Sequence, residues 1–243
     1  MATLDIPGDA RRVVHAVKAG GVAIIPMDVG YAGIGGCHDA LMRFFRAKGR
    51  GAHKRNAMLG NLDLHDELHL LDQRGRDMVR ALVLDYDLPV AVVGGFKEDH
   101  PLLRALGAEA LAASTEGGTL AMLLNAGNFL LEVTRQATEA SQPLFGSSAN
   151  LTGTGTRFRA GDVQPEIRAV ADVVVDYGLQ KFHLYRRSST MIDFRTMEVV
   201  RIGSCYEVIA DVLQRHFGVQ LPPDPGLEAL PSGHLREAQR HYG

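Results

Sequence analysis

Short apolar runs alternate with amphipathic segments along most of the chain. Apolar runs predict strands over residues 22–26, 57–62, 90–95, 119–124, 143–148, 173–178, 190–194 and 198–203. Amphipathic periodicity predicts helices over residues 10–19 capped by Asp9, 39–48, 63–84 with a break near Gly75, 128–140 and 207–216. Because strands and helices interleave, and strands cluster near the end, we expect an α/β or α+β fold with a mixed sheet.

A glycine-rich segment joins the first predicted strand to the next helix. It holds Gly30, Gly33, Gly35 and Gly36 and carries neither the dinucleotide fingerprint nor a Walker A loop. Glycines there could let a ligand approach the backbone closely, but a plain tight turn is the better-supported interpretation.

A basic stretch follows, with no acidic residue between Ala40 and Leu62. Its cations are Arg43, Arg46, Lys48, Arg50, Lys54 and Arg55. The whole chain has a net charge of −2, so this local excess suggests an anionic partner such as phosphate. A solvated helix end explains the same pattern equally well.

Two later segments are rich in hydroxyl groups. Residues 146–156 follow a predicted strand and could bind phosphate, ribose or carboxylate, or could form a flexible surface loop. Residues 186–193, with Arg201 and Gly203 downstream, place hydroxyls beside arginines and could either bind an anion or be structural.

Two histidines and two cysteines are the candidate metal ligands that we considered. His65 and His69 have the i, i+4 spacing of helical metal ligands, but the adjacent leucines suggest that both face solvent without binding metal. Cys37 and Cys205 are far apart, which argues against a cysteine-built zinc site and fits a reducing cytoplasm.

Length and composition set the domain organisation. The 243 residues, 46% of them hydrophobic, suffice for one large domain over 1–217. Residues 218–243 carry four of the chain's prolines, so we expect a Pro-rich C-terminal arm that is dispensable for folding. No apolar run approaches the roughly 20 residues of a membrane span, and no signal peptide is evident, so we expect no membrane association.

In this order and spacing, the four segments resemble the YrdC-like family. The family's opening motif, Pro-Thr-Asp/Glu-Thr-x-Tyr-Gly-Leu, resembles residues 26–33, and its Lys-x-Arg with a following Asn resembles Lys48, Arg50 and Asn56. The family's Ser-Ala-Asn-x-Ser-Gly motif resembles residues 148–153. Its Ser-Thr-x-x-Asp motif resembles residues 189–193, and its Arg-x-Gly motif resembles residues 201–203. The resemblance covers roughly residues 10 to 215.

The resemblance implies a twisted, open, mixed α/β sheet with helices and a basic concave face. It implies synthesis of threonylcarbamoyl-adenylate from ATP, bicarbonate and L-threonine in tRNA modification, with Mg²⁺ accompanying ATP. The residues it assigns to phosphate catalysis are Lys48 and Arg50. Those it assigns to ATP binding are Lys48, Arg50, Asn56, Thr119, Ser148, Asn150, Thr156 and Arg201. Those it assigns to the acceptor are Met27, Tyr31, Asn61, Leu123, Ser189 and Thr190.

The sequence departs from the family on the acceptor side. Met27 and Val29 replace both threonines of the opening motif, and Leu123 replaces an arginine that helps to hold the amino-acid carboxylate. The run Gly30-Tyr31-Ala32 resembles the YciO-type branch instead. We therefore expect L-threonine to be a poor substrate. Two alternatives remain open, a nucleotide- or RNA-binding protein without synthase activity and a relative that uses another small amine or carbamoyl donor.

Overall fold

The computed structural model describes residues 4–49 and 55–235. Its strands are β1 (Ala23–Ile25), β2 (Ala32–Gly35), β3 (Ala57–Leu59), β4 (His69–Leu70), β5 (Val90–Phe96), β6 (Thr115–Glu116), β7 (Thr119–Leu124), β8 (Phe145–Ser148), β9 (Val173–Val174), β10 (Met191–Asp193) and β11 (Glu198–Arg201). Its α-helices are α1 (Ile6–Lys18), α2 (His38–Ala47), α3 (Leu62–Leu68), α4 (Gln73–Arg80), α5 (Pro101–Leu106), α6 (Ala108–Ala112), α7 (Asn128–Glu139), α8 (Pro165–Arg168) and α9 (Tyr206–Phe217).

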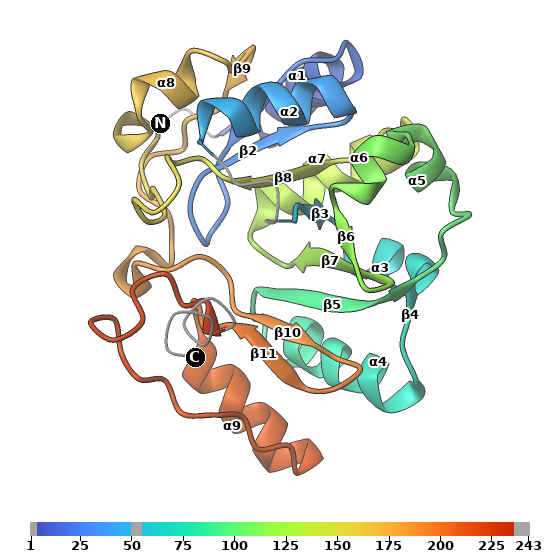
Figure 1. Cartoon of the computed structure of the whole chain (residues 1–243), viewed down its shortest axis with the longest axis vertical. Coiled ribbons are helices and arrows are strands. Elements are labelled where there is room, and N and C mark those ends of the chain that lie inside the picture. The colour runs from blue at the N-terminus through green and yellow to red at the C-terminus, as the bar shows by residue number, and fades with distance from the viewer. Residues whose placement is uncertain (1–3, 50–54, 236–243) are drawn as a thin grey trace.

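The strands form one open, mixed sheet (Figure 1). The sheet is 11-stranded, with the order β11-β10-β5-β7-β3-β8-β2-β1-β9, while β4 pairs with β5 and β6 with β7. The pairs β1–β9, β3–β7 and β5–β10 are parallel, and the other pairs are antiparallel. The predicted mixed α/β sheet is therefore confirmed.

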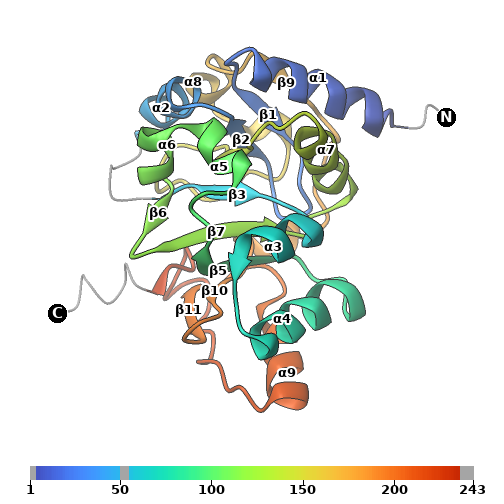
Figure 2. The same cartoon turned by 90° about the vertical axis from the view of Figure 1, so that its right-hand side faces the viewer.

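Helices cover both faces of the sheet. In Figure 2, α1 and α7 lie on one side of the upper strands, and α2, α5 and α6 lie on the other. Each layer closes over its own cluster of buried apolar side chains. The cluster under α1 and α7 also includes Met27, Leu59, Ala91 and Leu123, which are near the candidate site.

Two predicted helices differ from the observed ones at their ends. The first begins at Ile6 rather than after Asp9, because the Asp5 carboxylate accepts the Gly8 amide at 3.0 Å and caps it. The predicted 63–84 helix is broken before Gly75, since β4 separates α3 from α4 and Asp72 caps the second helix.

The glycine-rich segment contains a strand, which the prediction of a plain turn missed. β2 pairs with β1 as a hairpin and with β8 on its other side. A Cβ at Gly33 would lie 2.2 Å from the Phe44 ring, so this glycine lets α2 pack on the sheet. Gly30 has a φ of 113°, a backbone conformation that favours glycine, whereas the other three glycines of the segment have no positive φ.

The described part of the C-terminal arm packs against the domain. The buried Arg187 guanidinium donates to Asp224 at 2.7 Å and to the carbonyls of Gly226 and Leu230 at 2.8 and 2.6 Å. The Leu230 side chain is buried in the main cluster, and His234 bridges to Arg201 in β11. The described part of the arm is therefore packed against the domain, and whether it is dispensable for folding stays a prediction.

Among the described residues, no helix is long and apolar enough to cross a membrane.

Candidate functional site

The α1/α7 face of the sheet carries a row of small side chains. Register pairs Gly146 with Ala57, Ala57 with Ala121, and Ala121 with Val93. Paired residues point to the same face of a sheet, so these four lie side by side across it. Ser148 lies two residues beyond Gly146 in β8 and therefore projects from the same face. Within this row Ala57 and Ala121 are partly exposed.

Lys48 joins the basic motif to the Ser-Ala-Asn motif. It follows α2, its side chain is buried, and its ammonium donates to the Ser148 carbonyl. The ammonium also lies 5.4 Å from the centre of the Phe44 ring, and the Lys48 carbonyl accepts the Thr152 amide at 2.9 Å. Residues 100 positions apart are thus fixed together at one point.

Two asparagine side chains from the same two motifs are buried: Asn56 follows Lys48 in the sequence, and Asn150 follows Ser148. Asn56 donates to the Ser114 hydroxyl at 3.2 Å, and Asn150 donates to the Leu151 carbonyl at 2.6 Å. Within the described part of the chain, neither side-chain oxygen accepts a hydrogen bond. A buried acceptor without a donor is costly, so both oxygens are suited to a ligand that supplies N–H or O–H groups.

Thr156 and Thr119 have local structural contacts. The Thr156 methyl group would lie 2.3 Å from a Cβ at Gly30, so the hydroxyl-rich loop packs against the opening motif. The Thr119 hydroxyl donates to the Glu116 carbonyl at 2.6 Å, which stabilises the β6–β7 turn. Their roles in binding ATP stay predictions.

The strand-start motif is bonded into the C-terminal part of the sheet. The Arg201 guanidinium donates to the Ser189 carbonyl at 2.8 Å and to its hydroxyl at 2.9 Å. The fully buried Thr190 hydroxyl donates to the Ser204 carbonyl at 3.0 Å and accepts the Gly203 amide at 3.1 Å. Ser189, Thr190 and Arg201 are therefore brought together, and their roles in binding ATP or the acceptor stay predictions.

The predicted acceptor residues fall into two groups. Met27 and Leu123 are buried in one apolar cluster, so neither side chain offers a polar group to a carboxylate. Tyr31 is fully buried, and its hydroxyl contacts Asp176 and the Gly178 carbonyl, both at 3.0 Å. Burial raises the pKa of Tyr31 to about 12, and the residue fixes the 176–180 segment. The Asn61 side chain caps α3 by accepting the Leu64 amide at 2.9 Å.

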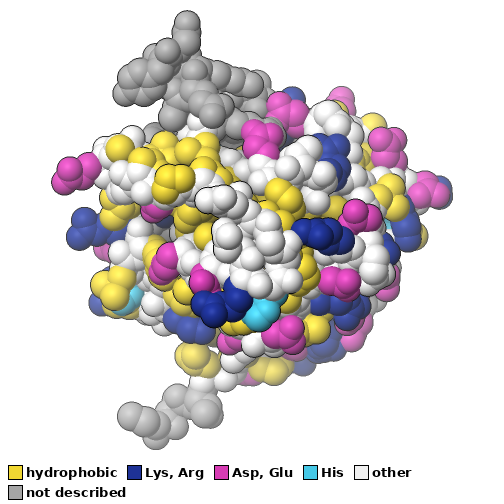
Figure 3. All heavy atoms as spheres, turned by 90° about the horizontal axis from the view of Figure 1, so that it is seen from below, with side chains coloured by type: hydrophobic (Ala, Val, Ile, Leu, Met, Phe, Trp, Pro, Cys, Tyr) yellow, Lys and Arg dark blue, Asp and Glu magenta, His cyan; other side chains and the backbone are white. Residues whose placement is uncertain are grey.

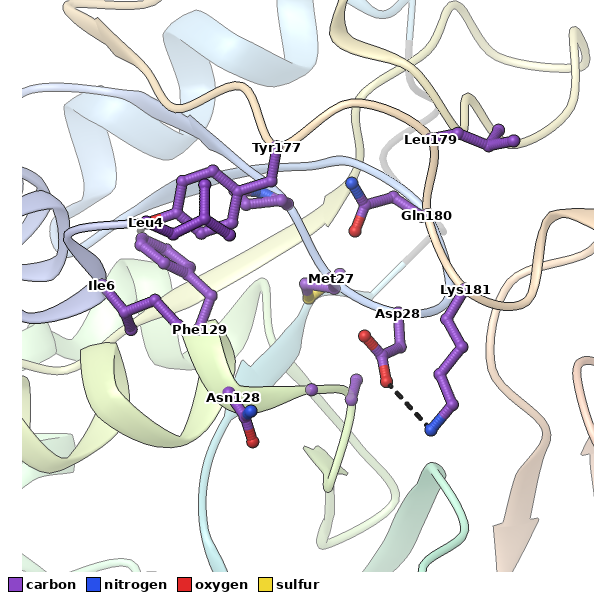
Figure 4. Close-up of a pocket in the computed structure, with 13 residues that line it drawn as sticks. Leu4, Ile6, Met27, Asp28, Asn128, Phe129, Tyr177, Leu179, Gln180 and Lys181 are labelled. Carbon is purple, nitrogen blue, oxygen red and sulfur yellow. Dashed lines mark ion pairs between the residues drawn. The ribbon is translucent and has the colours of Figure 1, made fainter. Parts of the chain in front are cut away.

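A charged pair that the sequence analysis missed joins the third residue of the opening motif, Asp28, to Lys181. Asp28 and Lys181 approach to 3.7 Å, and both line a pocket beside the start of α7 (Figure 4). Burial raises the pKa of the Asp28 carboxyl, while Lys181 opposes that shift. The pair joins residues more than 150 positions apart, so no local pattern could have indicated it.

Arg50 and Lys54 lie outside the described residues, so the basic concave face stays a prediction. Figure 3 shows one face of the molecule, on which the basic and acidic side chains of the described residues are interspersed with apolar ones.

The histidine pair is buried, which corrects the expectation that it faces solvent. The two Nδ1 atoms lie 2.7 Å apart, and His69 Nε2 lies 3.2 Å from the Leu120 carbonyl. Burial lowers the pKa of His65 to about 4 and that of His69 to about 3, so both are neutral at pH 7. The described residues contain no group of three or more side chains that could hold a metal ion.

Several solved structures share this architecture. The hypothetical protein smu.1377c from Streptococcus mutans UA159 has 21% identity and a TM-score of 0.72, over 86% of this chain and 92% of that one. Sua5 from P. abyssi, solved in complex with L-threonine, has 18% identity and a TM-score of 0.70, over 89% of this chain and 60% of that one. E. coli YciO has 19% identity and a TM-score of 0.60, over 81% of this chain and 90% of that one.

No family model matches the sequence, and no curated protein sequence matches it. The chain spans about three fifths of the length of Sua5. At these identities the structural likeness establishes the fold. The chain therefore has the YrdC-like fold that the sequence resemblance implied.

Proposed function

We propose that the protein is an ATP-dependent, adenylate-forming enzyme of the carbamoyl-adenylate type. An amine and bicarbonate give a carbamate and water. A carbamate oxygen then bonds to the α-phosphorus of ATP, the bond from that phosphorus to the bridging oxygen breaks, and pyrophosphate leaves. Such a reaction depends mainly on positioning the reactants and neutralising the phosphate charge.

The observation that carries the proposal is the contact between Lys48 and Ser148. It joins the two motifs that the resemblance assigns to ATP, and it holds a buried cation beside a hydroxyl-rich loop. An ammonium has three donors, so Lys48 can keep its bond to Ser148 while contacting a phosphate oxygen. The side-chain oxygens of Asn56 and Asn150 are suited to the hydroxyls of ribose or the amino group of adenine.

The acceptor side supports an amine other than threonine. Leu123 and Met27 share one apolar cluster, and the buried guanidinium of Arg187 is bonded to Asp224 in the arm. None of these three side chains would stabilise a substrate carboxylate in that cluster, and burying one there unpaired would cost several kcal/mol. We therefore favour a relative of the threonylcarbamoyl-adenylate synthases that acts on a different amine.

Mg²⁺ would enter with ATP. No group of three or more candidate metal ligands occurs among the described residues, and Mg²⁺ in such sites is held largely by substrate phosphates and water.

Nucleotide binding can be tested by calorimetry with ATP and Mg²⁺. We expect Lys48→Met to weaken binding by about tenfold or more, since charge-assisted hydrogen bonds contribute about 1.5–3 kcal/mol. Asn150→Asp should weaken it as well, because a negative charge two residues from Ser148 repels the triphosphate that Lys48 would bind, with little change of shape. Lys18→Met, at the exposed end of α1, is the matched control and should bind as the wild type does.

Unchanged ATP binding by folded Lys48→Met and Asn150→Asp would contradict the proposal. ATP binding without pyrophosphate release, with any amine, would instead favour the nucleotide- or RNA-binding alternative.

A further inference from the structure

Two adjoining cavities lie between the opening motif and the start of α7. Their volumes are about 300 and 350 Å³, and both are lined by Asp28, Gly127, Asn128 and Lys181. Asp87 and Asn125 line only the second, more polar cavity. Together they provide enough space for a small organic molecule.

The polar end of this pocket has more negative than positive groups. Asp28 and Asp87 contribute two carboxylates, and Lys181 is the one ammonium among its lining residues. Asp87 also accepts a hydrogen bond from the Asn125 amide at 2.8 Å. The contact of Lys181 with Asp28 is long, at 3.7 Å, and the lysine side chain is 56% exposed. Such an exposed pair is weak, so a ligand cation could displace Lys181 from Asp28.

The other end of the pocket is apolar. Leu4, Ile6 and Phe129 lie together opposite the charged pair, with Met27 between the two ends (Figure 4). The rings of Phe129 and Tyr177 pack edge to face with centroids 5.5 Å apart. The Tyr177 hydroxyl donates to Asp9 at 2.9 Å, so its ring also contributes an apolar surface.

We propose that this pocket binds a primary amine that has an apolar tail and no carboxylate. The ammonium group would lie between Asp28 and Asp87, and the tail would contact Met27 and Phe129. A zwitterionic amino acid fits less well, because its carboxylate would face two acidic groups and a single exposed lysine. The inference rests on the proposed function in one respect, that the amine would be the acceptor in the adenylation reaction.

Three probes that share one carbon skeleton test this inference by calorimetry without ATP. They are 3-methylbutylamine, L-leucine, which adds a carboxylate to that amine, and 3-methylbutan-1-ol, which lacks the charge. We expect the amine to bind about tenfold or more tightly than either of the others, as the loss of a charge-assisted hydrogen bond implies. Equal or tighter binding of L-leucine, or no binding of the amine, would overturn the inference.

Variants separate the contribution of each charge. Asp28→Asn should weaken amine binding by about tenfold. Asp87→Asn should also weaken it, and asparagine tolerates the φ of 51° at this position. Lys181→Met should strengthen amine binding by about two- to fivefold, because it removes the competing cation. Asp99→Asn, in an exposed turn, is the matched control and should have no effect.

The Lys181 variant is the sharpest test, because the two ligand classes respond in opposite directions. A site for an amino acid would lose affinity when Lys181 is removed, and that result would overturn the inference. These experiments use no nucleotide, so failure of the adenylation reaction leaves their outcome unaffected. Amine binding without pyrophosphate release would refute the proposed function alone.

Discussion

Replacing Arg187 with methionine should destabilise the protein, although this residue does not belong to the apolar cluster under α1 and α7. Its guanidinium is 4% exposed and donates to the Asp224 carboxylate and to two arm carbonyls, at 2.6–2.8 Å. Asp224 is 38% exposed and can be hydrated without the arginine, so the cost comes mainly from the two carbonyls left without a donor, at about 1–3 kcal/mol each. A domain of this length melts roughly 2–4 °C lower per kcal/mol, so we expect a decrease of roughly 4–24 °C.

Differential scanning calorimetry of Arg187→Met and of a chain truncated after Val219 would measure this effect. The truncation removes Asp224, both carbonyl acceptors and the buried Leu230 side chain, so its melting temperature should fall at least as far. Arg215→Met is the matched control, because Arg215 forms an exposed pair with Asp211 and should melt with the wild type. A decrease below about 3 °C in both variants would refute the anchoring role of the arm.

Two further predictions concern the packing of the fold. Because burial lowers the pKa of His65 and His69 to about 4 and 3, the unfolded chain binds protons first as the pH falls. The contribution of this pair to the free energy of unfolding should therefore be complete above pH 6.5 and should decline from there towards pH 3. In urea titrations at different pH values, the free energy of unfolding should depend less on pH for the double variant His65→Leu/His69→Leu than for the exposed control His15→Gln. Gly33→Ala should lower the unfolding free energy by about 1–3 kcal/mol, because its methyl group would overlap a ring of α2, while Gly161→Ala meets no atom within 4 Å. Unfolding that is independent of pH below 6.5, or equal stability of the two glycine variants, would contradict these accounts.

The sequence predicted the central strands well, because their apolar runs are continuous. β5 and β7 match the predicted ranges to within one residue. β2 was missed because glycine gives no hydrophobic signal. Glycine is needed at position 33 because the Phe44 ring of α2 packs directly against it. The start of α1 was misplaced because Asp5 and Asp9 are both good capping residues, and only the structure shows which one accepts the Gly8 amide.

The candidate site was predictable where it consists of motifs and unpredictable where it depends on distant pairing. The motif resemblance indicated Lys48 and Ser148, and these two residues are in contact. Asp28 and Lys181 belong to segments with no shared pattern, and the fold alone brings them together. The packing of the arm was not predicted for the same reason, since its acceptors lie 37 to 43 residues beyond Arg187.

The most direct test of the proposed activity is pyrophosphate release from ATP, measured with and without bicarbonate and an amine. We expect release that requires both, is faster with 3-methylbutylamine than with L-threonine, is lost in Lys48→Met and is retained in Lys18→Met. Release that is selective for L-threonine would contradict the account of the acceptor side. No release under any condition by a protein that binds ATP would contradict the adenylate-forming activity itself.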